Sequence, residues 1–309
     1  PYDDPRAWGL DDLPREVDER YARYLVARLA AYSNVWWSLA NEWDFVRTKT
    51  EADWERLGQL LQRIDPYNHL RSIHNGKRLF DQTRPWITHV SLQNGMAAAE
   101  ASRAVLFRDV WRKPVVFDEV KYEGNHDRRW AQLSGRELVQ RFWAVTIAGS
   151  YATHGEYFRD NPDRTVWVAQ GAHLQGQSPP RLAFLKQVLA TSPPEGIDPI
   201  DTFEDLTTAG QPGRYYLVYF GAQAPTVWVP RLYLTGMSDG LAFRAEVIDT
   251  WNMTVTPLEK PLLFKGHDRY HFVEASGQTV ALPGQPHMAI RLTRVRGSGA
   301  GAGRADVED

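Results

Sequence analysis

Two segments of this chain each have the pattern of a buried strand that ends in a glutamate, and this repeat constrains the fold more than any other feature. The first segment is residues 34–44, whose apolar run leads directly to Glu42. The second is residues 113–119, where Pro-Val-Val-Phe leads to an Asp and then to Glu119. Side chains carried on strands are held more precisely than side chains on loops. Two carboxylates delivered in this way are suited to one shared cleft.

Apolar runs of strand length alternate with amphipathic helical segments through the first two thirds of the chain. Such alternation is typical of βα units and of a parallel sheet. One of the helices also has a clear start, because Ser134 and Glu137 have the spacing of a capping box. The expected strands are residues 34–40, 69–74, 86–91, 114–119 and 149–153, and the expected helices are residues 16–31, 51–64, 96–109, 134–148 and 181–189.

Each of the five expected strands ends in polar or ionisable side chains. In chain order these are Glu42, His74, His89 with Ser91, Glu119, and His154 with Glu156. This distribution is typical of a (β/α)8 TIM-type barrel, whose chemistry lies at the C-terminal rim of its strands. Five strands correspond to strands 4–8 of such a barrel, so three βα units are missing upstream. A doubly wound open sheet is the rival fold, but it usually has a glycine-rich phosphate loop, which this chain lacks.

After about residue 196 the pattern changes to short strands separated by Gly, Pro and Asp. This spacing predicts a small antiparallel β-sandwich. We therefore expect part of a barrel domain in residues 1–196 and the sandwich in residues 197–295. Residues 296–309 begin with a Gly-, Ala- and Ser-rich run without apolar side chains to bury, which predicts a disordered tail. The expected sandwich strands are residues 214–220, 226–229, 242–248, 270–274 and 289–292.

Composition excludes several classes of protein. The chain has 36 basic and 38 acidic residues, a net charge of −2, which does not favour nucleic acid as a partner. It has no cysteine, so disulfides, thiolate metal sites and a cysteine nucleophile are excluded. No apolar run approaches the roughly 18–20 residues that span a bilayer, and no membrane association is expected. No signal peptide is visible, which slightly favours a cytoplasmic location, although the start without Met is that of a fragment or a processed product. Oligomeric state is left open.

The two glutamates have different expected environments. Glu42 follows a very apolar strand, so a low dielectric should raise its pKa and make it a general acid. The neighbouring amide of Asn41 could hydrogen-bond a sugar 2-hydroxyl. Near Glu119, Asp118 is a competing carboxylate. Strand alternation places Glu119 on the face of Phe117 and turns Asp118 the other way, toward a helix or loop partner.

Aromatic residues suggest a carbohydrate ligand, because their faces stack on the C–H faces of sugar rings. The chain has 12 Trp and 13 Tyr residues, and Trp43 and Tyr122 are candidate platforms next to the two glutamates. Most such rings in proteins belong to the hydrophobic core, which is the plain alternative for each of them.

Histidines at the expected strand ends are the remaining candidates. His74 and His89 either line the cleft or belong to the core. His154 and Glu156 lie two residues apart and so share a face, where they could bind substrate hydroxyls, form a metal pair or make a structural hydrogen bond. The histidines are scattered one per strand, without His-x-His or His-x-x-x-His spacing, so no metal is expected.

Several motifs together resemble a known group of enzymes. They are residues 37–42 (Trp-Ser-Leu-Ala-Asn-Glu), residues 65–75 (Asp-Pro-Tyr-Asn-His-Leu-Arg-Ser-Ile-His-Asn), residues 118–124 (Asp-Glu to Tyr-Glu-Gly) and residues 154–156 (His-Gly-Glu). The pattern resembles the clan A retaining glycoside hydrolases. It is closest to a poorly characterised bacterial family that joins an N-terminal immunoglobulin-like domain, a glycosidase barrel and a C-terminal β-sandwich of unknown function. Residues 247–254 are similar to that last domain, and the resemblance covers residues 10 to 295.

The resemblance implies an activity and two catalytic roles. It implies hydrolysis of O-glycosidic bonds in a poly- or oligosaccharide with retention, Glu42 being the acid/base and Glu119 the nucleophile, without a cofactor. The early strands of such barrels often place an Arg and a His or Asn beside the nucleophile, and these strands are not in this chain. Two other classes stay open. One is a non-catalytic carbohydrate-binding or scaffold protein, and the other is a metal-dependent barrel hydrolase that uses His74, His89, His154 and Glu156.

Overall fold

The structure, a computed structural model, describes residues 9–93, 95–160, 171–200 and 206–297. Most of the predicted tail, residues 296–309, therefore lies outside the described residues. Contacts divide the chain into two compact units. The first consists of Pro1–Gly95, Leu106–Val120 and Ser150–His154, and the second of Met96–Val105, Lys121–Gly149 and Gly155–Asp309. This division differs from the predicted boundary at residue 196, which stays a prediction.

The first unit contains five short parallel strands. β1 pairs with β2, and β3, β4 and β6 form a second parallel sheet in that order. A parallel bridge between His74 and Ser91 connects the β2 segment to β3, so the strands follow one another in chain order. The predicted parallel arrangement is confirmed, although each strand is only two or three residues long. The bounds are β1 Trp37–Ser38, β2 Arg71–Ser72, β3 Val90–Leu92, β4 Val115–Phe117 and β6 Tyr151–Ala152.

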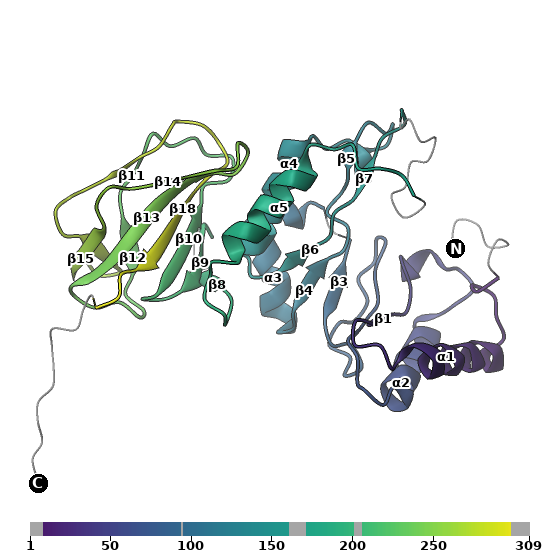
Figure 1. The fold of residues 1–309 in the computed structure, drawn as a ribbon. Coiled ribbons are helices and arrows are strands. Elements are labelled where there is room, and N and C mark those ends of the chain that lie inside the picture. Colours follow the sequence, from purple (N-terminus) through teal and green to yellow (C-terminus); the bar gives the residue numbers. More distant parts are fainter. Residues whose placement is uncertain (1–8, 94, 161–170, 201–205, 298–309) are drawn as a thin grey trace, which may run out of the picture. The chain divides into compact units, whose positions relative to one another are not determined.

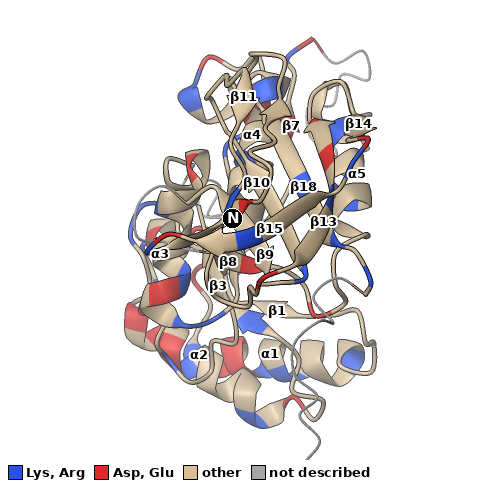
Figure 2. Ribbon diagram, turned by 90° about the vertical axis from the view of Figure 1, so that its left-hand side faces the viewer, with Lys and Arg blue, Asp and Glu red and all other residues tan. Residues whose placement is uncertain are grey.

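The helices α1 (Arg15–Leu29) and α2 (Glu51–Ile64) pack side by side in the first unit (Figure 1). α2 has the predicted bounds, because Thr50 and Asp53 form a capping box at its start. Acidic and basic residues are mixed over both helices (Figure 2). Lys49 reaches Asp18 at 2.6 Å, and both side chains are buried.

Asp65 connects the end of α2 to β1. Its Oδ2 accepts hydrogen bonds from the Trp37 indole at 3.0 Å and from the His69 backbone N–H at 2.8 Å, and its Oδ1 accepts from Tyr67 N–H at 3.1 Å. Burial works to raise the pKa of Asp65, but the hydrogen bonds from Trp37 and His69 outweigh it and hold the pKa below its ordinary value. The Asp-Pro pair predicted as a helix stop thus also fixes the strand that leads to Glu42.

The second unit contains the antiparallel sheet predicted for the C-terminal part. Its strand order is β12-β16-β15-β13-β18-β10-β9-β8, with β14 pairing to β13, and β11 pairs separately with β17. The bounds are β8 Asp198–Ile200, β9 Thr208–Gln211, β10 Tyr215–Tyr219, β11 Val227–Trp228, β12 Arg231–Tyr233, β13 Leu241–Asp249, β14 Thr254–Pro257, β15 Leu262–His267, β16 His271–Glu274, β17 Val280–Ala281 and β18 Met288–Arg294.

This sheet encloses one hydrophobic core. Leu232 of β12 and Ile290 of β18 belong to one buried cluster, which also includes Val280 of β17 from the separate two-stranded sheet. The two sheets therefore share one core. The five strands predicted here are all present with shifted ends, and the sequence pattern missed β8, β9, β12, β14, β15 and β17.

The helix α4 of the second unit packs against the sheet. α4 (Gly135–Ile147) begins at the predicted capping box of Ser134 and Glu137, and it packs along α5 (Ser178–Leu189). Trp143 of α4 stacks on Tyr219 of β10 with ring centroids 5.3 Å apart. The predicted helix at residues 96–109 is divided into η2 (Ala97–Ala99) and α3 (Ala101–Trp111). Among the helices of the described residues, none has the length and apolar character to cross a membrane.

Candidate active site

Glu42 lies just after β1 in an unusual backbone conformation. It precedes the 3-10 helix η1 (Trp43–Phe45) with φ 51° and ψ 55°, in the left-handed region. The residue is only 7% exposed. A non-glycine residue in a sparsely populated region costs about 1–3 kcal/mol, and such costs concentrate at functional sites. The chain therefore holds this carboxylate in place at the expense of stability.

Asp44 fixes the loop that carries Glu42. Its carboxylate accepts backbone N–H bonds from Gly76 at 2.6 Å and from Lys77 and Arg78 at 2.8 Å each. Burial works to raise the pKa of Asp44, but these backbone bonds outweigh it and lower the pKa. The loops after β1 and β2 are thus joined. The sequence analysis did not select Asp44, although it directly follows the motif that ends in Glu42 and Trp43.

Gln93 contacts Glu42 directly. Its side-chain amide donates to Glu42 Oε1 at 2.6 Å, and its own Oε1 lies 3.3 Å from His74 Nε2. Asn75 accepts from the Gln93 backbone N–H at 3.2 Å and holds the segment in place. The sequence analysis missed Gln93 because the strand was expected to end at residue 91.

His74 connects the two predicted catalytic carboxylates, because it contacts Glu119 directly and Glu42 through Gln93. Its Nε2 lies 3.5 Å from Glu119 Oε1, and its Nδ1 lies 3.0 Å from Ser91 Oγ. Burial works to lower the pKa of His74, but the hydrogen bond and charge of Glu119, with help from Gln93, outweigh it and raise the pKa. Glu119 thus stabilises the protonated imidazole relative to the neutral one.

The direction of the Asp118 side chain differs from the prediction. Strand alternation turned it away from the site, but its Oδ2 accepts a hydrogen bond from Ser91 and lies 3.9 Å from His74 Nδ1. Phe117 instead contacts α3, with its ring centroid 5.9 Å from that of Phe107. The prediction was wrong because β4 ends at Phe117, so alternation no longer determines the side-chain directions beyond it.

The pKa of Glu42 is raised, as predicted. Burial is the largest cause, the hydrogen bond from Gln93 opposes it, and the charge of Glu119 raises the pKa further. The influence of Glu119 means that the two carboxylates interact. Glu42, Gln93, His74 and Glu119 form one continuous polar chain within the first unit.

Two candidate binding residues are elsewhere. Trp43 is 2% exposed, with its ring against Phe80 at 5.2 Å and under the Arg78 guanidinium at 4.6 Å. A sugar cannot stack on this ring, so the prediction that Trp43 binds substrate is wrong. His89 precedes β3 instead of ending a strand, and it is buried in a stack with Trp36 at 4.9 Å. The prediction placed His89 at a strand end because it took residues 86–91 as the strand, whereas Trp86 and Ile87 are core residues.

Asn41 is exposed and faces a different hollow from Glu42. It lines a cavity of about 220 Å³ along β1 together with residues of α1 and α2, such as Leu25 and Leu57, and Glu42 is not among the lining residues. Its predicted bond to a sugar 2-hydroxyl stays a prediction.

The candidates Tyr122 and Glu156 lie in the second unit. Glu156, at the start of β7 (Glu156–Tyr157), accepts backbone N–H bonds from Gln175 at 2.6 Å and Gly176 at 3.0 Å. Glu123 of the parallel β5 (Glu123–Gly124) does the same for Gln177 at 2.6 Å and the first residue of α5 at 3.0 Å. Both glutamates are buried. Glu156 therefore holds the segment that leads into α5, and its contact with substrate stays a prediction.

Tyr122 belongs to an aromatic cluster that includes two rings the sequence analysis did not select. Its ring meets Trp130 edge-on at 5.5 Å, and Trp130 lies 4.6 Å from His126. Tyr122 is half-buried and stays a candidate platform. His154 follows β6 in the first unit, is half-buried, and likewise stays a prediction.

The site of this α/β protein thus contains a buried acid after one parallel strand and a second carboxylate after a later one, joined through Gln93 and the His74 imidazole. Comparison with known proteins gives the family. Residues 5–160, just over half of the chain, match the apiosidase-like catalytic domain, and the chain belongs to this family. Residues 205–293 match a domain of unknown function, DUF5605. This agrees with the C-terminal domain expected from the sequence.

One solved structure is closely similar over nearly the whole chain. It is a protein of Bacteroides vulgatus ATCC 8482, provisionally described as a glycoside hydrolase, with 35% identity and a TM-score of 0.89. The match covers 94% of this chain and 58% of that protein, so the chain spans little more than half the length of its relative.

Two further solved structures align only loosely. A Paenibacillus polymyxa xyloglucanase solved with xyloglucan has 8% identity and a TM-score of 0.44, over 90% of this chain and 70% of its own. An arabinofuranosidase of Xanthomonas axonopodis pv. citri has 11% identity and a TM-score of 0.43, over 93% and 74%. No curated protein matches the chain.

Proposed function

We propose that the chain contains the catalytic carboxylates of a retaining O-glycoside hydrolase of clan A type. In this proposal β1, β2, β3, β4 and β6 are strands 4–8 of a (β/α)8 barrel, and Glu42 and Glu119 end the fourth and seventh strands. The observation that carries the proposal is the polar chain from Glu42 through Gln93 and His74 to Glu119. Membership in the apiosidase-like family agrees with it.

The two carboxylates have environments that suit different roles. Burial and the nearby charge of Glu119 raise the pKa of Glu42, so Glu42 keeps its proton to a higher pH and can act as the acid. Glu119 lies 3.5 Å from His74 Nε2 and is three-quarters buried, so a donor fixes the direction of its carboxylate. Cleavage of a glycosidic bond with retention requires one carboxyl group that donates a proton and a neighbouring carboxylate that acts as the nucleophile.

The proposed reaction has two displacements. A Glu119 oxygen attacks the anomeric carbon, while the bond to the leaving oxygen breaks and that oxygen takes the proton of Glu42. In the second step Glu42 takes a proton from water, the water oxygen bonds to the anomeric carbon, and Glu119 is released. Retention requires the carboxyl groups to be about 5–5.5 Å apart, whereas about 6.5–9.5 Å would correspond to inversion.

The test uses an active preparation of the protein and a panel of aryl glycosides that begins with apiosides, as the family name directs. Glu119→Gln should reduce kcat by at least about 10⁴-fold, and ¹H NMR of the first product should show the anomeric configuration of the substrate. Glu42→Gln should spare the first displacement of substrates with a nitrophenolate leaving group, because this group departs without a proton. The exposed Glu100→Gln is the matched control. Full activity of Glu119→Gln, or an inverted product, would overturn the proposal.

A non-catalytic protein that binds carbohydrate is the second candidate. It predicts saturable sugar binding without turnover in every preparation, and the same NMR experiment distinguishes it. A metal-dependent hydrolase is the third candidate, and activity that survives exhaustive chelation would eliminate it.

A further inference from the structure

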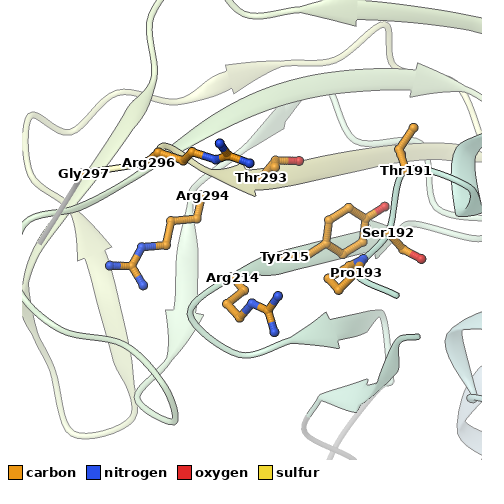
Figure 3. A pocket seen from close by; sticks show the side chains of 9 residues that line it. All are labelled: Thr191, Ser192, Pro193, Arg214, Tyr215, Thr293, Arg294, Arg296 and Gly297. Atoms are coloured by element: carbon orange, nitrogen blue, oxygen red, sulfur yellow. The ribbon is translucent and has the colours of Figure 1, made fainter. Parts of the chain in front are cut away.

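A hollow in the second unit is lined by hydroxyl groups whose protons are already used within the fold. It has a volume of about 490 Å³ and lies where β10 begins and β18 ends (Figure 3). Thr191 and Ser192 line it, but their hydroxyl groups donate to the carbonyl oxygens of Val188 and Leu189 at 2.7 Å each. These protons hold the chain at the end of α5 and are not available to a ligand. In the first unit, committed protons bear on the charge of a buried side chain, His74.

On one side of the His74 ring, the hydroxyl group of Ser91 is placed to accept a hydrogen bond. This hydroxyl donates to Asp118 Oδ2, and a serine hydroxyl has one proton to give. His74 Nδ1 lies 3.0 Å from Ser91 Oγ and 3.9 Å from Asp118 Oδ2. Ser91 and His74 are both buried. Because the proton of Ser91 is committed to Asp118, Nδ1 makes its contact with Ser91 as an N–H donor.

On the other side of the ring, the side-chain amide of Gln93 has a defined orientation. Its nitrogen donates to Glu42 Oε1 at 2.6 Å, which turns its oxygen toward His74 Nε2 at 3.3 Å. Glu119 Oε1 lies 3.5 Å from the same ring nitrogen. An amide oxygen and a carboxylate oxygen are both acceptors. Nε2 therefore faces two acceptors and, like Nδ1, is placed to donate.

The charges around the ring match a cation. Asp118 lies on the Nδ1 side and Glu119 on the Nε2 side. Burial works to lower the pKa of His74, but the hydrogen bond and charge of Glu119, with the charge of Asp118, help to raise it above its ordinary value. His89 also interacts with Asp118, but burial lowers its pKa, which favours a neutral ring. The positive charge between the two carboxylates therefore belongs to His74.

We propose that His74 is a fixed imidazolium with a proton on each ring nitrogen, and that Ser91 and Asp118 are the positioning residues that keep it in this form beside Glu119. Ser91 presents a lone pair to Nδ1 because Asp118 takes its proton. The resulting cation holds the Glu119 carboxylate ionised and fixes its direction. The charge of His74 does not depend on the proposed function, whereas its effect on Glu119 as a nucleophile rests on it.

NMR of the ¹⁵N-labelled whole chain reads the charge of His74 without any need for turnover. The two nitrogens of an imidazolium have similar ¹⁵N shifts, whereas the unprotonated nitrogen of a neutral ring is shifted far from the other. The chain has nine histidines, and the signals that disappear in His74→Gln belong to His74. We expect the imidazolium pattern to persist at pH 7.5, where a free imidazole with a pKa of about 6.5 is mostly neutral.

Variants of the two positioning residues test the origin of this charge. Asp118→Asn removes a charge 3.9 Å from Nδ1 at nearly constant size, so the midpoint of the His74 titration should fall by about one pH unit or more. Ser91→Ala should also lower the midpoint, because the N–H at Nδ1 loses its acceptor. Asp109→Asn, exposed on α3, is the matched control and should leave the midpoint unchanged. Thermal melts show whether each variant is folded.

In an active preparation, the pH profile separates a positioning role from a merely structural one. Nitrophenyl glycosides are the substrates, because their leaving group departs without the proton of Glu42. The alkaline limb of kcat/KM then follows His74, while the acidic limb follows Glu119. In Asp118→Asn the alkaline limb should move to lower pH by the same amount as the NMR midpoint. A merely structural role would lower kcat/KM at every pH and leave the limb in place.

Three results would overturn the proposal: a neutral His74 in the wild type at pH 7, equal midpoints in Asp118→Asn and the wild type, or an alkaline limb that does not move. The first result would mean that the Gln93 amide has the opposite orientation, with its oxygen on a protonated Glu42. Absence of hydrolase activity would leave the NMR measurement unchanged, so the charge of His74 and the proposed function can fail separately.

Discussion

Replacing Glu42 with Gln should stabilise the fold, because this carboxylate is held where its charge is unfavourable. Burial and the charge of Glu119 both raise the pKa of Glu42, and the Gln93 hydrogen bond only partly opposes them. Glu42→Gln removes the charge but keeps the oxygen that accepts from the Gln93 amide at 2.6 Å. The left-handed backbone at φ 51° is unchanged by the substitution. We expect a gain of about 1 kcal/mol in the free energy of unfolding at neutral pH, within the usual range for relief of a strained functional residue.

The dependence on pH gives the sharper test. A pKa that is raised in the folded state favours folding below the unfolded pKa of about 4.3, and this contribution is lost as the pH rises through the folded pKa. Glu42→Gln should therefore equal the wild type at the acidic end and exceed it progressively toward pH 8. Urea unfolding followed by tryptophan fluorescence at pH 5 and pH 8 measures both differences.

The exposed Glu259→Gln is the control and should change neither value. If Glu42→Gln were less stable than the wild type at pH 8, or if its advantage were greater at pH 5, the carboxylate would be a favourable part of the fold. The argument for a buried, destabilised acid would then be wrong.

Two further substitutions test the framework around the site. Asp65→Asn should lower the free energy of unfolding by about 3 kcal/mol, because an amide replaces one oxygen that accepts hydrogen bonds from buried donors. The loss should become smaller at acidic pH, where the Asp65 carboxyl of the wild type, whose pKa is lowered, becomes protonated. Urea titrations measure the loss, with the exposed Asp109→Asn as the control. Gly58→Ala should also destabilise, by about 1–3 kcal/mol, since its new methyl would lie 2.3 Å from Trp86 Cδ2, and this clash exceeds the helix propensity gained. A higher melting temperature than that of the exposed Gln62→Ala would contradict this packing.

Local signals were sufficient for the helices. α2 has the predicted bounds and ends at the Asp65-Pro66 stop, and α4 begins at the predicted capping box. These capping and stop signals involve residues within four positions of one another, so they can be recognised from the sequence alone. The apolar period at residues 96–109 did not reveal the break before α3, because the three alanines of η2 are strong helix formers and contain no stop signal.

Strands were harder because their partners are distant in sequence. β3 lies four residues later than predicted at its start, since the apolar run from Trp86 to Ile87 packs with α2 before the strand begins. Apolar runs mark burial, and burial occurs both in strands and in the segments that precede them. The missed strand β14 is exposed along its whole length, and in β15 the exposed position 263 is an apolar Leu, so neither strand shows a clear alternation in the sequence.

At the candidate site, too, the directions of single side chains depend on contacts with residues that are distant in the sequence. Glu42, His74 and Glu119 were predicted because each follows an apolar run, and the structure joins them through one polar chain. Gln93 was missed, and Asp118 was turned the wrong way. Gln93, Asp118 and Glu119 lie within two residues of the last residue of a strand, and Glu42 lies four residues beyond β1. The apolar run determines where the backbone arrives, but alternation fixes side-chain direction only while pairing continues.

Past that point, direction is set by hydrogen bonds between loops, such as the three backbone bonds to Asp44 that hold the loop after β2 against the loop after β1. Those bonds join residues more than thirty positions apart, so no local pattern reports them. The left-handed backbone of Glu42 has the same origin, because the closed loop imposes a conformation that the residue would not choose alone. The strand ends of this chain therefore indicate which residues reach the site. The geometry of these residues relative to one another depends on hydrogen bonds between loops, which form only in the folded chain.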